Sequence, residues 1–190
     1  RRRASACCAR SNSAGAASCC ASSANVLDPA TSLALAERVA DTARSLGLDT
    51  ALIGAAALAV HRYTRGTEDI DLAIDVDPVG ALDHALAREG LRTRLRLPDD
   101  EDPLGGVLSV WAAEDEAQQP TDVVEVVNFH NPGRAVGTPA RAAIARAQPL
   151  PDSPLRCVTI EDLIALKLYA GGLGDLADIA KSRPGFQHGP

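Results

Sequence analysis

Residues 52–77, LIGAAALAVHRYTRGTEDIDLAIDVD, decide the fold of this chain. They predict a short apolar strand, a break at Gly54, a helix over residues 55–63, a turn, and a second strand that starts at Glu68 or Asp69. A glycine between a strand and a helix lets the backbone approach a ligand, and the N–H groups at the start of the helix attract phosphate. The stretch therefore predicts a mixed α/β (α+β) domain with a ligand site beside the glycine.

The second strand carries its carboxylates on one face. Side chains on a strand alternate between faces, so one face is apolar and the other carries the four aspartates Asp69, Asp71, Asp75 and Asp77. Aspartate is a poor strand former and like charges repel, so this face requires water or a cation. Asp69 and Asp71 open the strand beside Gly54, which favours a metal site for a phosphate-bearing substrate. The alternative is an acidic, solvated edge strand.

Gly54-Ala55, the helix after it, Thr67 and Asp69-Ile70-Asp71-Leu72 resemble the opening motif of the nucleotidyltransferase superfamily. The residues of this motif most resemble those of the toxin nucleotidyltransferases of type IV toxin–antitoxin and abortive-infection systems. The resemblance implies one domain, a mixed β-sheet flanked by helices. It also implies transfer of a nucleoside monophosphate from a nucleoside triphosphate (NTP) to an acceptor hydroxyl. Two Mg²⁺ ions would be held by Asp69, Asp71 and a third aspartate.

The third aspartate belongs to the strand predicted over residues 121–128, TDVVEVVN. Asp122, at the start of this strand, is the best match to the aspartate that completes the metal site in the family. Glu125 is the competitor, but strand alternation puts it on the face opposite Asp122. The alternative role for Asp122 is a cap at the start of the strand.

The helix predicted after Thr159 resembles the C-terminal motif of the same family, in the order that the family requires. The resemblance implies that Lys167, together with Gly54, Ala55 and Thr67, binds the nucleotide. The resemblance also implies that Asp175 and Asp178, further along the chain, support this nucleotide site. A lysine that only extends its ammonium group to water is the alternative for Lys167.

Ala55 departs from the family, because a glycine or serine usually stands there and a serine hydroxyl would contact phosphate. The alternative function is therefore a weak or inactive nucleotide-binding relative that acts through protein interaction. A separate feature is the strand predicted over residues 91–97, whose polar face carries Arg92, Arg94 and Arg96. This basic face is either solvated or contacts nucleic acid.

Composition sets the remaining expectations. The chain has 190 residues, a net charge of -6 and 46% hydrophobic residues, and no apolar run is long enough for a membrane span. We expect a low-complexity tail over residues 1–26, a nucleotidyltransferase-like domain over residues 27–180 and an irregular tail over residues 181–190. A disulfide framework is absent from the predicted domain, which favours the cytoplasm. Because position 1 is not methionine, the chain is expected to be a fragment or a processed form.

The expected partners follow from the resemblance. They are an NTP, an acceptor such as tRNA or a protein hydroxyl, and an antitoxin. The sequence does not select among the acceptors, and it does not identify the nucleotide.

Overall fold

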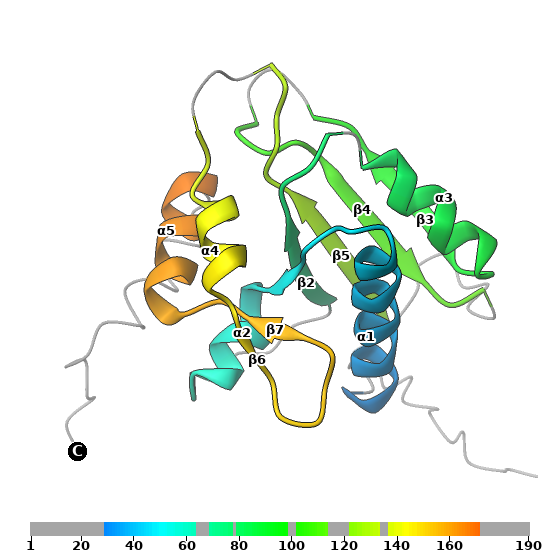
Figure 1. Ribbon diagram of the computed structural model, residues 1–190, viewed down its shortest axis with the longest axis horizontal. Helices are drawn as coiled ribbons and strands as arrows, with labels where there is room; N and C mark the ends of the chain where they lie inside the picture. Colours follow the sequence, from blue (N-terminus) through cyan, green and yellow to red (C-terminus); the bar gives the residue numbers. More distant parts are fainter. Residues whose placement is uncertain are drawn as a thin grey trace, which may run out of the picture.

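The computed structural model describes residues 29–63, 69–77, 79–98, 102–113, 122–133 and 137–171. Within these ranges a seven-stranded sheet has the strand order β3-β4-β5-β2-β1-β7-β6 (Figure 1). The strands are β1 (Ala51–Leu52), β2 (Asp69–Ile74), β3 (Arg92–Arg96), β4 (Val107–Trp111), β5 (Val123–Asn128), β6 (Gln148–Pro149) and β7 (Arg156–Cys157). The helices are α1 (Pro29–Ser45), α2 (Gly54–Val60), α3 (Gly80–Arg88), α4 (Ala140–Arg146) and α5 (Ile160–Ala170). The predicted single domain, a mixed sheet flanked by helices, is confirmed.

The sheet is mixed because its central strand pairs in both directions. β2 is antiparallel to β1 and parallel to β5, while β4 is antiparallel to both β5 and β3. β1 is parallel to β7, which is antiparallel to β6. The short strand β6 was not predicted, since two residues that include a proline carry no strand signal.

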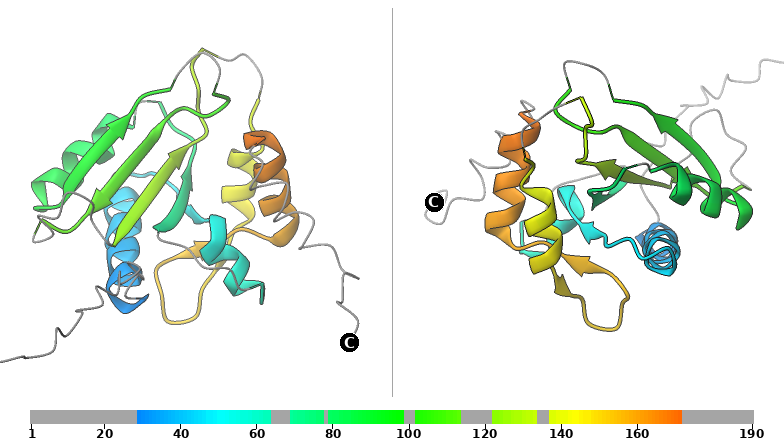
Figure 2. Two further views of the ribbon diagram at one scale, coloured as in Figure 1. Left: turned by 180° about the vertical axis from the view of Figure 1, so that it is seen from behind. Right: turned by 45° about the horizontal axis from the view of Figure 1, so that its top comes forward.

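Helices α1 and α3 cover one face of the sheet, where α1 contacts β2 and β5 and α3 contacts β3. Six strand residues that alternate onto this face are buried and apolar: Ile70, Leu72, Leu108, Val110, Val124 and Val126. Seen from behind, strands β3, β4 and β5 lie in front of α1 and α3, so these helices leave the opposite face uncovered (Figure 2). We call this second surface the open face.

Helices α4 and α5 pack against each other at one side of the sheet, and α5 also contacts α2 (Figure 1). Thr159 caps α5, because its hydroxyl accepts a hydrogen bond from the backbone N–H of Asp162. Arg146 at the end of α4 pairs with the buried carboxylate of Asp162. The helix ends at Gly171, which has a left-handed φ of 73°. None of the helices within the described ranges is long and apolar enough to cross a bilayer.

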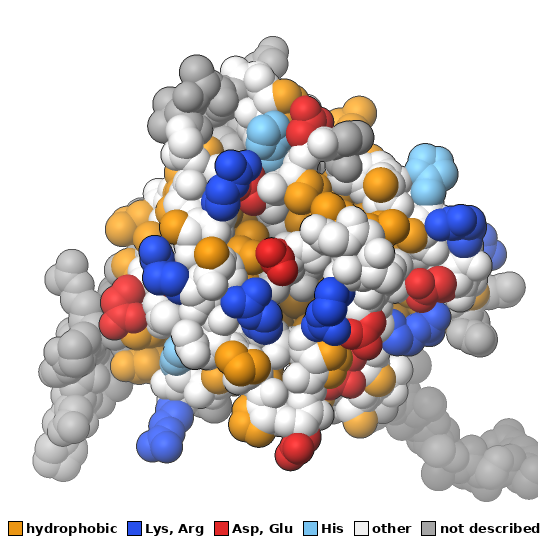
Figure 3. All heavy atoms as spheres, in the orientation of Figure 1, with side chains coloured by type: hydrophobic (Ala, Val, Ile, Leu, Met, Phe, Trp, Pro, Cys, Tyr) orange, Lys and Arg blue, Asp and Glu red, His pale blue; other side chains and the backbone are white. Residues whose placement is uncertain are grey.

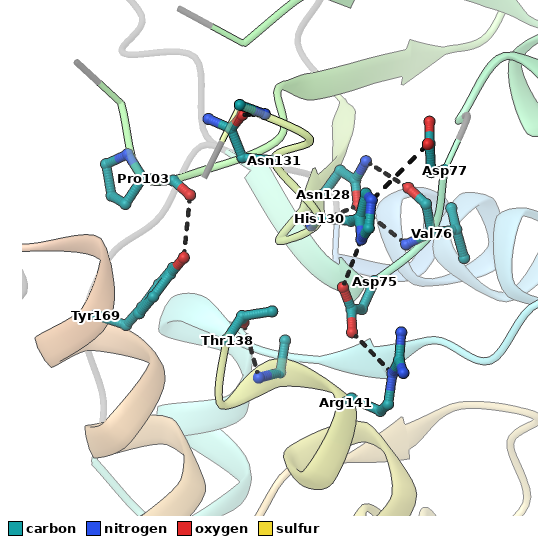
Figure 4. A network of polar contacts seen from close by, with 12 residues as sticks. Asp75, Val76, Asp77, Pro103, Asn128, His130, Asn131, Thr138, Arg141 and Tyr169 are labelled. Atoms are coloured by element: carbon teal, nitrogen blue, oxygen red, sulfur yellow. Dashed lines mark hydrogen bonds and ion pairs between the residues drawn. The ribbon is translucent and has the colours of Figure 1, made fainter. Parts of the chain in front are cut away.

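The four aspartates predicted on one face of the second strand fall into two groups with different partners. β2 ends at Ile74, and the carboxylate of Asp75, only 5% exposed, accepts a hydrogen bond of 3.2 Å from Arg141 of α4 (Figure 4). His130 lies between Asp75, at 3.7 Å, and Asp77, at 3.9 Å. These two aspartates therefore attach the end of β2 to α4 and to the segment after β5, while Asp69 and Asp71 face a different set of groups.

Candidate metal and nucleotide site

Three carboxylates meet where β2 and β5 pair. The parallel register places Asp69 opposite Val123 and Asp71 opposite Glu125, so all of these side chains lie on the open face. One carboxylate oxygen from each of Asp69, Asp71 and Glu125 lies within 4.8 Å of the other two, and all three residues are half-buried. This metal cluster, as we call the three residues, unites the predicted aspartate pair with a glutamate.

The metal cluster is electrostatically strained. Burial raises the pKa of Glu125 above its ordinary value, and the charge of Asp69 raises it further. The hydroxyl of Ser109 donates to Glu125 at 3.3 Å, and this bond, with the charges of Arg96 and Arg94, acts in the opposite direction. A divalent cation would remove the repulsion among the carboxylates, and an all-oxygen donor set is the one that Mg²⁺ and similar hard cations bind. The residues present therefore fit such an ion.

Asp122 does not join the metal cluster, which corrects the sequence-based choice of the third carboxylate. Asp122 precedes Val123, the residue opposite Asp69, so alternation directs its side chain to the face that α1 covers. There its carboxylate accepts a hydrogen bond of 2.6 Å from the hydroxyl of Ser32 on α1. The competitor Glu125 takes the position that the prediction gave to Asp122.

Gly54 leaves room for one carboxylate of the metal cluster. It is the first residue of α2 and has a left-handed φ of 63°, which favours glycine. A Cβ at this position would lie 1.8 Å from Oδ2 of Asp71. The predicted break between strand and helix is thus also the wall of the site.

Lys167 of α5, far from Gly54 in the sequence, lies at the same site as Gly54 and Asp71. Gly54, Asp71 and Lys167 line one cavity of about 190 Å³, and Lys167 is only 8% exposed. The two sequence motifs that resemble the nucleotidyltransferases therefore contribute residues to one cavity. The rest of the wall is largely apolar: Ile53, Leu104, Val127, Phe129, Leu163, Leu166 and Ala170.

Phe129 is one of the wall residues that the sequence analysis did not identify. It is 3% exposed and its ring centroid lies 6.2 Å from that of Tyr169 on α5, so it joins the end of β5 to that helix. Its signal in the sequence was weak, because a single aromatic residue after a strand is common in any core.

The remaining predicted residues have different outcomes. Ala55 is the second residue of α2 and is only 2% exposed, so its side chain packs inside the domain. Thr67, Asp175 and Asp178 lie outside the described residues. The predicted tails over residues 1–26 and 181–190 lie outside them as well, so the domain boundaries stay predictions.

Comparison with known proteins supports the fold. No model of a protein family matches this chain, and no curated protein matches it. Among solved structures, a candidate nucleotidyltransferase from Thermotoga maritima is similar to 82% of this chain over 94% of its own, with 13% identity and a TM-score of 0.51. This likeness shows that the chain has a nucleotidyltransferase-like fold, which confirms the resemblance at the level of the superfamily fold.

Two further solved structures are similar at lower TM-scores. ANT(2")-Ia in complex with adenylyl-2"-tobramycin matches 81% of this chain over 79% of its own, with 19% identity and a TM-score of 0.45. An antigenic nucleotidyltransferase-like protein from Paracoccidioides brasiliensis matches 81% over 74%, with 17% identity and a TM-score of 0.48. The toxin branch of the superfamily stays a prediction.

Proposed function

We propose that this chain is a metal-dependent nucleotidyltransferase, which moves a nucleoside monophosphate from an NTP to an acceptor hydroxyl and releases pyrophosphate. The observation that supports this proposal most strongly is the position of the metal cluster. Its carboxylate Asp71 also lines the cavity that contains Lys167 and Gly54. Anionic ligands for a cation thus adjoin a cationic side chain for phosphate, which is the arrangement that a triphosphate and its metal require.

The residues of the metal cluster would hold two Mg²⁺ ions. When bound, these ions neutralise phosphate charge and align the attacking and leaving oxygens. Asp69, Asp71 and Glu125 provide the carboxylate oxygens, and Glu125 replaces Asp122 in this role because the sheet register places it beside the pair. The half-buried position of all three carboxylates limits competition from water.

The other residues would bind the triphosphate and move one proton. Lys167 faces the negative charge of the phosphates, and the backbone N–H groups of Gly54 and Ala55 donate to them at the start of α2. The acceptor oxygen forms a bond to the α-phosphorus while the bond to the β-phosphate oxygen breaks. Glu125 takes the proton of the acceptor hydroxyl, because it offers a carboxylate oxygen beside Asp69 and Asp71 that can act as a general base.

A role as a toxin component, with tRNA or a protein hydroxyl as acceptor and an antitoxin as partner, extends this proposal on the sequence resemblance alone. The alternative is an inactive relative that binds nucleotide. The buried methyl group of Ala55, at the position where the family offers a hydroxyl to phosphate, favours that alternative.

The test is transfer of label from each NTP, with Mg²⁺ and total tRNA, by the whole chain. Asp71→Asn removes a ligand of the metal cluster and should abolish transfer, whereas Asp83→Asn on α3 is a matched control that should retain it. Calorimetric titration with Mn²⁺ reports on the metal cluster without relying on activity. Nucleotide binding that is indifferent to metal, without transfer to any acceptor, would support the inactive relative.

A further inference from the structure

A row of polar side chains crosses the open face from the metal cluster to the edge of the sheet. Three consecutive strand pairs place Asp71 opposite Glu125, Glu125 opposite Ser109, and Ser109 opposite Arg94. Residues directly opposite each other in neighbouring strands share a face. Because neighbouring strands are about 4.8 Å apart, Arg94 lies roughly 14 Å from Asp71 along this row.

Arg94 is the middle of an arginine stripe, which we define as Arg92, Arg94 and Arg96 on β3. All three residues are exposed and alternate onto the open face, with Arg92 opposite Trp111 of β4. A groove of about 370 Å³ is lined by Arg94 and Arg96 at one side and by Ser109 and Glu125 at the other. The groove therefore connects the arginine stripe to a carboxylate of the metal cluster.

The arginine stripe concentrates positive charge on one strand of the open face. The whole chain has a net charge of -6, and on the face seen in Figure 3 acidic and basic side chains are interspersed. Arg96 pairs with Asp102 at 3.4 Å, but neither Arg92 nor Arg94 forms an ion pair with any residue in the described ranges. A row of guanidinium groups is complementary to a ligand with repeated negative charge, because each group can bind a phosphate through two hydrogen bonds.

We propose that the arginine stripe binds the phosphate backbone of a single-stranded polynucleotide, whose terminal hydroxyl reaches the metal cluster along the groove. This inference rests on the proposed function and names the class of its acceptor. Alternate residues of a strand are about 6.6 Å apart, so the stripe can contact successive phosphates of an extended chain. Trp111 on the same face offers a surface on which a base can stack.

A polycationic acceptor, such as an aminoglycoside, would be repelled by the same side chains. A peptide hydroxyl would leave most of the stripe without a partner. The repeated charge of the stripe therefore favours a polynucleotide over both.

The chain contains one tryptophan, which makes the binding site directly observable. A single-stranded RNA of about twelve nucleotides, a length within the range that one domain covers, is titrated into the whole protein while Trp111 fluorescence is recorded at several salt concentrations. The double variant Arg92→Ala/Arg94→Ala is compared with the matched control Arg88→Ala, which removes an exposed arginine from α3. Arg94→Lys retains charge but loses two-point phosphate binding.

We expect RNA to change the fluorescence of Trp111, and the double variant to bind at least tenfold more weakly. The slope of log K against log salt should become less negative by about 1.4, or about 0.7 for each lost phosphate contact. Arg88→Ala should bind within about twofold of the parent protein, and Arg94→Lys should lie between the parent and the double variant. RNA affinity that is equal in the double variant and in Arg88→Ala, or the absence of a fluorescence change, would overturn the inference.

Binding of NTP with Mg²⁺ is measured on the same proteins, so that failure of the two proposals can be told apart. If the protein binds NTP but the double variant binds RNA as tightly as the parent protein does, only the inference about the arginine stripe is contradicted. Arginine-dependent RNA binding without NTP binding supports the binding surface and contradicts the proposed transfer reaction.

Discussion

Gly54 and Asp71 compete for one volume, because a side-chain carbon on Gly54 would lie 1.8 Å from Oδ2 of Asp71. A backbone hydrogen bond holds the two residues close together, since the N–H of Ile53 donates to the carbonyl oxygen of Asp71 at 3.0 Å. The glycine therefore fulfils two requirements at once, a left-handed backbone and an open space for a carboxylate of the metal cluster.

Gly54→Ala should impair the site more than the fold. The left-handed backbone costs an alanine about 1–2 kcal/mol of folding free energy, and the displaced Asp71 should reduce transfer about 100-fold. Thermal unfolding and Mn²⁺ titration measure the two effects separately. Gly80→Ala is the matched control, because a Cβ at Gly80 meets no atom of the described residues within 4 Å, apart from its own helix and chain neighbours. Metal affinity equal to that of the parent in Gly54→Ala would contradict the proposed role of the glycine.

Glu125→Gln should raise stability without metal and abolish the stabilisation that metal provides. Burial and Asp69 raise the pKa of Glu125, so the folded protein binds this proton more tightly than the unfolded chain does. Without metal, Glu125 therefore reduces the free energy of unfolding as the pH rises from its ordinary pKa of 4.5 through the raised value. Thermal unfolding at neutral pH, with and without Mg²⁺, measures both effects. Glu125→Gln should unfold at a higher temperature than the parent without metal, and Mg²⁺ should no longer raise its unfolding temperature.

Asp122→Asn is the comparison that decides between the two carboxylates. It weakens the contact with Ser32 on α1 and leaves the metal cluster intact, so Mg²⁺ should still raise the unfolding temperature of this variant. A loss of that response in Asp122→Asn, with Glu125→Gln unaffected, would restore the sequence-based choice.

Asp162 should stabilise the protein at neutral pH and cease to do so in acid. The hydrogen bond from Arg146 lowers the pKa of Asp162, against the smaller opposing effect of burial. A lowered pKa means that the carboxylate contributes stability above its ordinary value of 3.8, and that this contribution disappears as the pH falls through the lowered value. The difference in free energy of unfolding between the parent and Asp162→Asn, from denaturant titrations across pH, should therefore narrow toward acid. A constant difference would show that the ion pair contributes nothing.

Cys157 should resist alkylation while the protein is folded. Burial raises the pKa of its thiol to about 11, so the reactive thiolate is scarce at neutral or mildly alkaline pH. Treatment with iodoacetamide at about pH 8, followed by peptide mass mapping, should leave Cys157 unmodified. The same treatment in denaturant should modify it fully, and rapid modification of the native protein would show that β7 opens readily.

Asp75 and Arg141 should be energetically coupled. Arg141→Ala leaves the buried Asp75 carboxylate, whose Oδ1 has no hydrogen-bond partner among the described residues, without its guanidinium donor. We expect a loss of about 1–3 kcal/mol, and a smaller additional loss when Asp75→Asn is present too. A double-mutant cycle by denaturant unfolding measures this coupling, and strictly additive losses would exclude it.

Features that depend on neighbouring residues could be predicted before the fold was known. The alternation in the second strand identified Asp69 and Asp71 as one face, and Gly54 identified the break at the start of α2. The threonine cap and apolar pattern identified α5 with Lys167. These features could be predicted because backbone geometry repeats over a few residues.

The partners that those residues meet depend on packing between distant elements. The register of β2 against β5 selects Glu125 instead of Asp122, and a shift of one residue would exchange them. The same is true of the row that joins Arg94 to Asp71, which depends on the registers of three successive strand pairs. Register depends on how the whole sheet buries its apolar face against α1 and α3, and a local pattern contains no record of that packing.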